Sequence, residues 1–489
     1  MREANWEIAI FGTFDVENYG DLLFPLIAQA ELAERLGSVK LHQFSYSAKP
    51  VPDWPYAVTS LTELPEIVGC LDSVLIGGGF IIRFDKEVAP AYGPPIPAIH
   101  HPTGYWLTPA LIALQHGIPL FWNAPGMHCN EVPPWADQLM KLALEHSRYI
   151  AVRDKPSQQA LARFVDKANI AVVPDTGFGI SRLLDERHPS AEFSRLRELS
   201  DLTDPYIVVQ ASKGLDAFPA FIKTYSHLFR DFRFLVLPIS PVLGDNEANV
   251  CEDLPGRISL PVWPHPLVLA ELISQASAVV GHSYHLAITA LAFGVPVFSS
   301  ANLSVGKYTA LSRFETIFPL PKESETDPHV FIKLLGKSRP SPTVSATVDQ
   351  LTHHWDHIAR KLREGETNTQ PALNRFWQSL PNLLEDANQH SLALEAECVN
   401  KERRIDELSE VSDRFRAEIV ARDDRIVALE SESLQKQRRI DELSKLMGLA
   451  RSEIVARDDR IASLRNSPSM KVTTPLRFLM RHLKRLTPE

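Results

Sequence analysis

Between residues 8 and 298, short apolar runs alternate with longer segments in which apolar residues recur every three or four positions. The short runs predict buried strands, and the periodic segments predict helices that pack one face on a sheet. The first example is Ile8–Ile10, followed by a periodic segment over 22–36 that Gly37 ends. Alternation of this kind is typical of α/β domains with parallel sheets. The predicted strands lie at 8–10, 41–46, 73–76, 119–123, 149–152, 170–173, 206–210, 232–238, 258–262, 278–280 and 295–298.

The series of strands and helices occurs twice, which predicts two lobes. A polar stretch over 182–204 is the expected linker between them. We expect an α/β fold of two Rossmann-like lobes that resembles a GT-B-type arrangement, with a ligand cleft between the lobes and a long C-terminal coiled-coil helix. The expected boundaries are 1–195 for the first lobe, 196–335 for the second, 336–390 for a linker with helices, 391–466 for the coiled coil and 467–489 for a basic amphipathic tail.

The segment 278–300 is the most informative part of the second lobe. A buried strand turns at Gly281 into a helix that Ser283 can cap, and His285 lies in the first turn of that helix. Free N–H groups at such a corner bind anions, and an imidazole beside an anion is drawn toward its charged form, as an acid catalyst requires. The alternative is that His282 and His285 are ordinary polar residues of a strand-to-helix turn.

Polar residues also follow the first strand. The loop 13–21 is long for a strand-to-helix connection, and its Asn18, Gly20 and Asp21 are placed to line a ligand. The alternative is that Asp21 serves the N-terminus of the following helix as an Asx-type cap.

Three further features follow predicted strands. Gly77, Gly78 and Gly79 allow the backbone to approach a ligand or another segment closely. Arg153 ends a strand, where it either faces an anionic substrate or pairs with Asp154, which then caps the next helix. The loop 83–104, rich in proline, histidine and aromatic residues, is predicted to be a flap beside the site.

Composition narrows the class of protein. The 489 residues are 44% hydrophobic and 23% charged, and the net charge of −9 argues against broad nucleic-acid binding. The four cysteines form no CxxC pair, which favours a reducing compartment and gives no metal-binding pattern. The N-terminus has neither the basic start nor the apolar run of a signal peptide. We therefore expect a cytoplasmic protein with no metal, no cofactor and no nucleic-acid partner.

Several motifs, taken in order, resemble the polysaccharide pyruvyl transferase family over about residues 6 to 320. These are Asn18-x-Gly20-Asp21, Gly77-Gly78-Gly79, Val152-Arg153-Asp154 with Ser157, Pro174-Asp175 and Gly281-x-Ser283-Tyr284-His285. The resemblance implies transfer of a pyruvyl group from phosphoenolpyruvate to two hydroxyls of a sugar, giving a cyclic ketal during surface polysaccharide biosynthesis. It implies His285 and Arg153 as catalytic residues.

The same resemblance implies a substrate-binding set of Asn18, Gly20, Asp21, Gly77, Gly78, Gly79, Asp175, Gly281 and Ser283. Several family members carry arginine where this chain has Ser283, and serine cannot replace a bidentate guanidinium. Arg83, Lys213 and Lys307 are candidates for the missing positive charge. Two other functions remain open: a nucleotide-sugar glycosyltransferase, and a catalytically degenerate scaffold whose coiled coil recruits polysaccharide enzymes.

The C-terminal part contains an internal repeat. Residues 401–409 recur at 436–444 with one difference, and 418–426 recur unchanged at 453–461, so the offset is five heptads. Isoleucine dominates one heptad position and leucine the position three residues later, which predicts a coiled coil. This arrangement favours a parallel dimer, so we expect a homodimer through 391–466. The alternative is a single solvated charged helix.

The last segment, 470–486, is basic and amphipathic, with Pro475 expected in its first helical turn. This pattern suits the surface of an anionic membrane, so we expect peripheral contact with the inner face of the membrane. The alternative is a short helix that packs on the chain's own domains, or a frayed end.

Overall fold

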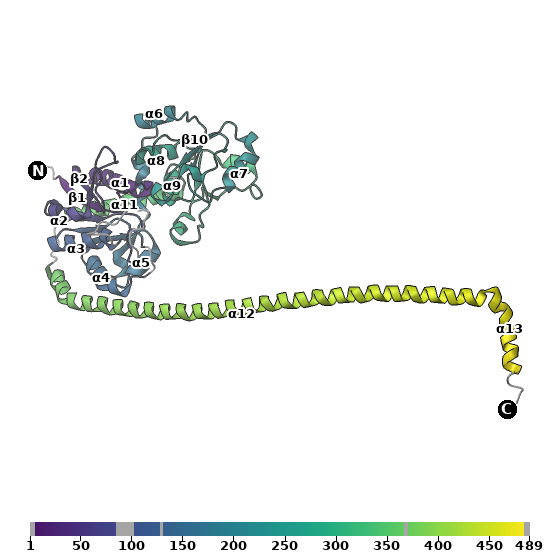
Figure 1. The fold of residues 1–489 in the computed structure, drawn as a ribbon. Coiled ribbons are helices and arrows are strands. Elements are labelled where there is room, and N and C mark those ends of the chain that lie inside the picture. The colour runs from purple at the N-terminus through teal and green to yellow at the C-terminus, as the bar shows by residue number, and fades with distance from the viewer. Residues whose placement is uncertain (1–4, 85–101, 128–130, 366–369, 484–489) are drawn as a thin grey trace. The chain divides into compact units, whose positions relative to one another are not determined.

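The computed structural model describes residues 5–84, 102–127, 131–365 and 370–483. The chain forms two units, Met1–Asn388 and Gln389–Glu489. Within the described residues, the first unit holds two parallel sheets with helices on their faces (Figure 1). The predicted α/β fold with two lobes in a GT-B-like arrangement is confirmed.

The first sheet has the strand order β3-β2-β1-β4-β5-β6-β7, and the described pairs are all parallel. Its direction of winding reverses between β1 and β4. The strands are β1 (Trp6–Phe11), β2 (Val39–Ser45), β3 (Val58–Ser60), β4 (Ser73–Ile76), β5 (Leu120–Trp122), β6 (Ser147–Val152) and β7 (Ile170–Val172). The helices that accompany this sheet are α1 (Tyr19–Leu36), α2 (Leu64–Ile67), α3 (Leu107–His116), α4 (Asp137–Glu145) and α5 (Lys155–Leu161).

The second sheet has the order β10-β9-β8-β11-β12-β13, and its direction of winding reverses between β8 and β11. Its strands are β8 (Tyr206–Gln210), β9 (Arg233–Leu237), β10 (Arg257–Ser259), β11 (Ala278–Gly281), β12 (Val297–Ser299) and β13 (Ile317–Pro319). The helices of this part are α6 (Ala191–Leu199), α7 (Ala217–Thr224), α8 (Pro266–Ser274), α9 (Tyr284–Ala292) and α10 (Pro328–Leu334). The predicted linker 182–204 therefore contains a helix, α6, which begins at the Ser190 cap.

The two lobes share one apolar core. Helices α1 of the first lobe and α8 and α9 of the second contact one another, and their buried faces belong to one hydrophobic cluster. Tyr19 of α1 and Thr289 of α9 are both buried, and their hydroxyls lie 2.7 Å apart. The relative position of the sheets is therefore set by helix packing and buried hydrogen bonds.

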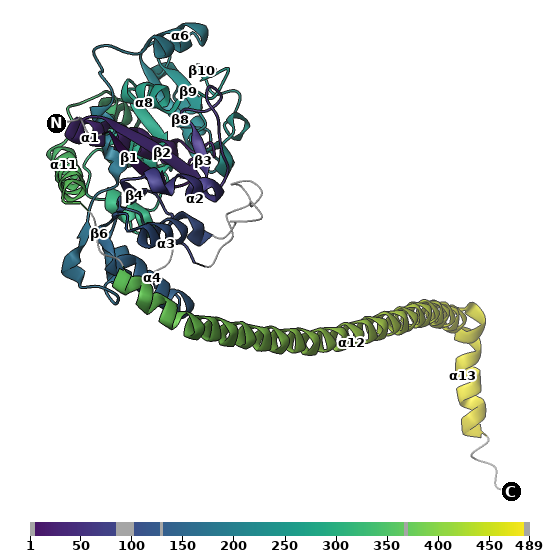
Figure 2. The ribbon, with the colours of Figure 1, turned by 90° about the vertical axis from the view of Figure 1, so that its left-hand side faces the viewer.

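After the second lobe, the chain returns to the first through α11 (Pro342–Arg363). Figure 2 shows α11 beside α1, and Trp355 and Ile358 are buried in the shared core. Buried His354 contacts two residues of the first lobe: its Nε2 lies 3.0 Å from Asn123 Oδ1 and its Nδ1 lies 3.1 Å from Tyr149 Oη. With hydrogen on Nε2, the neutral ring donates to Asn123 and accepts from Tyr149.

Two helices make up the C-terminal part. α12 (Gln370–Asn466) is continuous, so the helix predicted over 391–466 begins earlier, within the segment expected to be a linker with helices. α13 (Pro468–Leu483) begins at Pro468, which corrects the expectation that Pro475 lies in its first turn. Among the helices that the structure describes, none combines the length and apolar character that crossing a bilayer requires.

His354 gives a prediction for the pH dependence of stability. Burial, with smaller contributions from positive charge on His357 and Arg35, lowers the pKa of His354 from 6.5 to about 3. Below pH 6.5 the imidazole of His354 is therefore protonated in the unfolded chain but stays neutral in the folded chain. The free energy of unfolding thus decreases as the pH falls from 6.5 toward 3. At pH 5.5 this loss is about 1.4 kcal/mol.

We expect His354→Gln to lose less stability than the wild type between pH 7.5 and pH 5.5, as measured by thermal unfolding. His353→Gln is the matched control, because His353 is exposed on the same helix. Equal pH dependence in all three proteins would contradict the assignment.

Candidate active site

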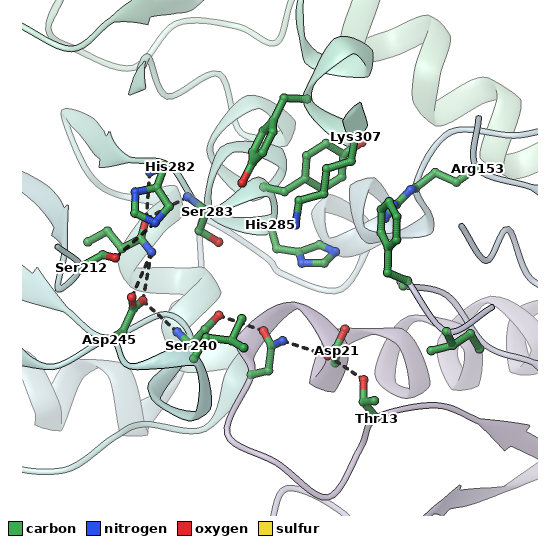
Figure 3. A pocket seen from close by; sticks show the side chains of 18 of the residues that line it. Thr13, Asp21, Arg153, Ser212, Ser240, Asp245, His282, Ser283, His285 and Lys307 are labelled. Carbon is green, nitrogen blue, oxygen red and sulfur yellow. Dashed lines mark hydrogen bonds between the residues drawn. The ribbon is translucent and has the colours of Figure 1, made fainter. Parts of the chain in front are cut away.

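A cavity of about 460 Å³ lies between the lobes. Its walls include the loops that follow β1 and β4 in the first sheet and β8 and β11 in the second, together with Lys307 and Tyr308 (Figure 3). In both sheets these loops leave the strands where the direction of winding reverses, which is where open α/β sheets bind ligands. The two binding edges therefore face each other across one pocket.

Asp175 is the buried anion behind this pocket. It follows β7, and its Oδ1 accepts a hydrogen bond of 2.9 Å from Gly177 N. Its Oδ2 accepts a bond of 3.1 Å from Arg153 Nη1 and lies 3.7 Å from His285 Nε2. Burial opposes ionisation, but the imidazole of His285, the guanidinium of Arg153 and the N–H of Gly177 lower the pKa of Asp175 below its ordinary value. Asp175 is therefore a stable carboxylate that joins a residue of each lobe.

Among the described residues, buried Arg153 Nη2 has no hydrogen-bond partner, and buried His285 Nε2 has none either, since Asp175 Oδ2 lies 3.7 Å away, beyond hydrogen-bond distance. The Arg153 side chain is 3% exposed, and its guanidinium carbon lies 4.3 Å from the centre of the Phe80 ring. A buried donor without an acceptor is costly, so the pair is prepared for an anionic ligand. The strand-end pair predicted for Arg153 is also present, since Asp154 caps α5 by accepting from Ser157 N.

The imidazole of His285 rests on the backbone of Gly20. A Cβ at position 20 would lie 1.8 Å from His285 Nδ1, so any side chain there would displace the ring. Phe24 contacts the same ring edge to face, with the ring centres 5.5 Å apart. Gly20, for which the resemblance implies substrate binding, also makes room for the imidazole.

Asp21 lies on the first-lobe wall of the pocket. Its Oδ2 accepts hydrogen bonds from Thr13 Oγ1 at 2.6 Å and from Asn18 Nδ2 at 2.9 Å, and among the described residues its Oδ1 accepts none. Asn18 Oδ1 in turn accepts from Ser240 Oγ of the second lobe at 3.0 Å. The helix begins at Tyr19 without a side-chain cap, so the alternative role of Asp21 as a helix cap is not observed.

The charges around Asp21 differ from those around Asp175. Burial raises the pKa of Asp21, while His285, the Thr13 hydroxyl, Lys307 and Arg83 lower it in part. Burial also disfavours the charged form of Lys307 and so lowers its pKa, and the positive charge of Arg153 lowers it further. Asp21 on the pocket wall and Asp175 behind it therefore have pKa values shifted in opposite directions.

The corner between β11 and α9 is partly filled by the protein itself. Ser283 caps α9 as predicted, accepting from Leu286 N. The side-chain carbonyl of Gln210 accepts from His282 N at 2.9 Å and Ser283 N at 2.8 Å, so two of the N–H groups assigned to an anion are occupied. Gly281 leaves room for Gln210, since a Cβ there would lie 2.6 Å from Gln210 Oε1.

Of the three candidates for the missing positive charge, Lys307 and Arg83 line the pocket, and Lys213 is exposed outside it. Lys307 Nζ lies 5.9 Å from the Phe80 ring centre and 5.8 Å from that of Tyr284, and Figure 3 shows its side chain directed toward His285. The sequence did not separate these lysines, because each follows or precedes a glycine in a polar loop.

The three glycines after β4 have different roles. Gly79 lines the pocket, whereas a Cβ at Gly77 would lie 2.4 Å from Phe11 O and one at Gly78 would lie 2.5 Å from the Phe24 ring. The structure therefore gives packing roles to Gly77 and Gly78, for which the resemblance implied ligand contact. Most of the predicted flap, residues 85–101, lies outside the described residues.

The pocket also contains residues that the sequence did not single out. They include Thr13, Phe80, Gln210, Ser212, Ser240, Asp245 and Tyr308. Neither periodicity nor motif identifies them, because they come from loops far apart in the chain. Across the described ranges, no group of three or more His, Cys, Asp or Glu side chains could hold a metal ion.

Comparison with known proteins gives one family. The family model described as polysaccharide pyruvyl transferase matches residues 18–304. A search of curated proteins finds no match.

Solved structures with a similar fold include the UDP-GlcNAc 2-epimerase from Methanocaldococcus jannaschii, with a TM-score of 0.44 and 11% identity, covering 72% of this chain and 100% of that one. The UDP-GlcNAc 2-epimerase from Neisseria meningitidis bound to UDP-GlcNAc has a TM-score of 0.44 and 11% identity, covering 72% and 99%. A glycosyltransferase from Rickettsia africae has a TM-score of 0.37 and 12% identity, covering 78% and 99%.

The contact of Gly20 with His285 can be tested by substitution. We expect Gly20→Ala to lower stability by about 1–3 kcal/mol, because the added methyl overlaps a packed ring at the contact between lobes. Gly69→Ala is the control, since a Cβ at position 69 meets nothing within 4 Å. Thermal unfolding measures both, and equal melting temperatures for the two variants would refute the close contact.

Proposed function

The chain belongs to the polysaccharide pyruvyl transferase family, and from this we propose that its pocket transfers the pyruvyl group of phosphoenolpyruvate to two hydroxyls of a saccharide, forming a cyclic ketal and releasing phosphate. One observation carries the proposal. Asp175 Oδ2 lies 3.1 Å from Arg153 Nη1 and 3.7 Å from His285 Nε2, and among the described residues buried Arg153 Nη2 has no hydrogen-bond partner. An anion-binding group and an acid–base group are thus held by one carboxylate.

Phosphoenolpyruvate carries a phosphate and a carboxylate, so its site needs several positive groups. Arg153, Lys307 and Arg83 line the pocket and provide them. The partly dehydrated Lys307 gains most from an anion, because burial has already weakened its hold on the proton. In this proposal these residues take the place of the arginine that other family members carry at position 283.

The reaction needs a proton donor and a proton acceptor. His285 gives a proton to the methylene carbon while a sugar hydroxyl adds to the neighbouring carbon, and Asp175 stabilises the imidazolium before the transfer. Asp21 takes the proton of that hydroxyl through its free Oδ1. In the second step, the neutral imidazole takes the proton of the second hydroxyl as its oxygen displaces phosphate, and Asp21 returns its proton to the leaving phosphate. Both residues are then reset.

The other end of the pocket suits the saccharide. Figure 3 shows Ser212, His282, Asp245 and Ser240 together, on the side away from Arg153. Hydroxyl, imidazole and carboxylate groups can donate to and accept from sugar hydroxyls. We place the acceptor there, between these groups and Asp21.

The alternatives from the sequence predict other ligands. A nucleotide-sugar glycosyltransferase would place a diphosphate at the start of α9, where Gln210 already accepts from His282 N and Ser283 N. A degenerate scaffold would have no need to maintain the buried, unpartnered Arg153 Nη2. Both observations favour the pyruvyl transferase, acting in the synthesis of a surface polysaccharide.

Donor binding tests the proposal. We expect calorimetry to show phosphoenolpyruvate binding to the full chain, with Lys307→Gln weakening it roughly tenfold to 100-fold, because a charge-assisted hydrogen bond contributes about 1.5–3 kcal/mol. Lys213→Gln is the matched control, with the same change made outside the pocket. Binding of UDP or UDP-GlcNAc in place of phosphoenolpyruvate would favour the glycosyltransferase, and no binding of any donor would favour the scaffold.

Asp21→Asn separates catalysis from donor binding. We expect phosphoenolpyruvate to bind at least as tightly as to the wild type, because the change removes a negative charge near Lys307 and Arg83. Release of phosphate in the presence of a saccharide acceptor should fall by roughly 100-fold or more, as expected when a general base is lost. A variant that keeps full turnover would exclude Asp21 as the base.

A further inference from the structure

The part of α12 from Glu402 to Asn466 carries an uncovered apolar stripe. Along it, isoleucine and leucine side chains at the two seam positions of each heptad are about half exposed or more, for example Ile405 at 64% and Ile461 at 49%. The apolar seam residues are Ile405, Leu408, Phe415, Ile419, Ile426, Leu429, Ile440, Leu443, Met447, Ala450, Ile454, Ile461 and Leu464. A solvated helix gains nothing from a stripe at this spacing, whereas a second helix buries it.

Five polar residues interrupt the seam, and they determine the direction of a partner helix. They are Ser412, Arg422, Ser433, Lys436 and Arg457. A parallel dimer in register places each seam residue against its own copy. Three layers of that dimer would then set arginine against arginine or lysine against lysine at the centre of the interface, where charges are partly desolvated and repel.

An antiparallel pair removes all three of these layers. In one register, the apolar seam residues of one helix face apolar seam residues of the other. The pairs are Ile405 with the partner's Leu464, Leu408 with the partner's Ile461, Phe415 with the partner's Ile454, Ile419 with the partner's Ala450, Ile426 with the partner's Leu443 and Leu429 with the partner's Ile440. In the remaining layers, Arg457 meets the partner's Ser412, Lys436 meets the partner's Ser433 and Arg422 meets the partner's Met447. No basic seam residue faces another, and the thioether of methionine accommodates the stem of Arg422.

Charges beside the seam do not reverse this preference. In the antiparallel register two contacts attract: Glu432 with the partner's Arg439 and Glu402 with the partner's Arg465. Two contacts repel: Glu418 with the partner's Glu453 and Arg416 with the partner's Arg451. In the parallel register, only Arg425 with the partner's Glu430 attracts, against three like-charged contacts. The seam and its flanks therefore favour the same direction.

We propose that residues 402–466 bind a second copy of this chain as an antiparallel two-stranded coiled coil, with the twofold axis between Leu434 and Gln435. Lys436 lies next to this axis and pairs within its own helix with Glu432, at 2.6 Å. Its charge is therefore compensated in the central layer, where it meets the partner's Ser433. The direction differs from the parallel dimer that isoleucine and leucine content alone favours.

Cys398 reports on the direction without any substitution. It falls on the seam, so a parallel dimer places it against its own copy, where oxidation forms an interchain disulfide. In the antiparallel register it lies beyond the partner's Asn466, where α12 ends, and roughly 110 Å from the partner's Cys398 at about 1.5 Å per residue. We expect the wild-type chain to sediment as a dimer and, after mild oxidation, to yield no Cys398–Cys398 peptide by mass spectrometry.

Engineered cysteines give the positive result. In a Cys398→Ser background, we expect Leu408→Cys alone and Ile461→Cys alone to remain uncrosslinked through the new residue, and the double variant to form a covalent dimer that links 408 to 461. Sedimentation of all three under reducing conditions confirms that each is still a dimer. Crosslinking of either single variant to its own copy would establish the parallel dimer, and a monomeric full-length chain would overturn the proposal.

Discussion

The pocket depends on the carboxylate of Asp175. Two nitrogen groups, Arg153 Nη1 and His285 Nε2, approach its Oδ2, and they come from different lobes. Without this buried anion, a guanidinium and a protonatable imidazole would lie near each other in a cavity with little water, and their repulsion would separate the lobes. The Asp175 carboxylate holds this positive charge at the pocket wall, and Arg153 Nη2 can still donate a hydrogen bond to a ligand. The same ion pair therefore contributes to the fold and prepares the site.

The contact between lobes depends equally on a residue without a side chain. His285 occupies the space beside Gly20 that a Cβ would fill, and the neighbouring Tyr19 and Asn18 bond across to the second lobe through Thr289 and Ser240. The start of α1 therefore connects the two lobes and also forms part of the pocket wall. This explains why polar residues gather in a loop longer than the connection requires.

The sequence predicted the described strands except β3 and β13, the two lobes and the turn at Ser283, because apolar periodicity and helix caps are local properties. It also pointed to Arg153, directly after β6, and to His285, in the first turn of the helix that follows β11, and both line the pocket. It could not predict that Gln210 fills the corner at Gly281, or that Lys307 and not Lys213 enters the pocket, because these contacts join segments about 70 or more residues apart. Gly77 and Gly78 illustrate a related point: a glycine that admits a ligand and one that admits Phe24 look alike in sequence.

The two pocket carboxylates show how one environment separates acid from base. Asp175 is buried among positive groups and an N–H donor, which lower its pKa, whereas burial dominates at Asp21 and raises its pKa. A carboxyl with a low pKa stays charged and supports an imidazolium beside it; one with a raised pKa is a stronger base and can also return a proton. The proposed ketal formation needs both properties, because a proton must reach carbon while another leaves oxygen. In that proposal, Asp175, 3.7 Å from His285 Nε2, supports the acid, and Asp21 on the pocket wall is the base.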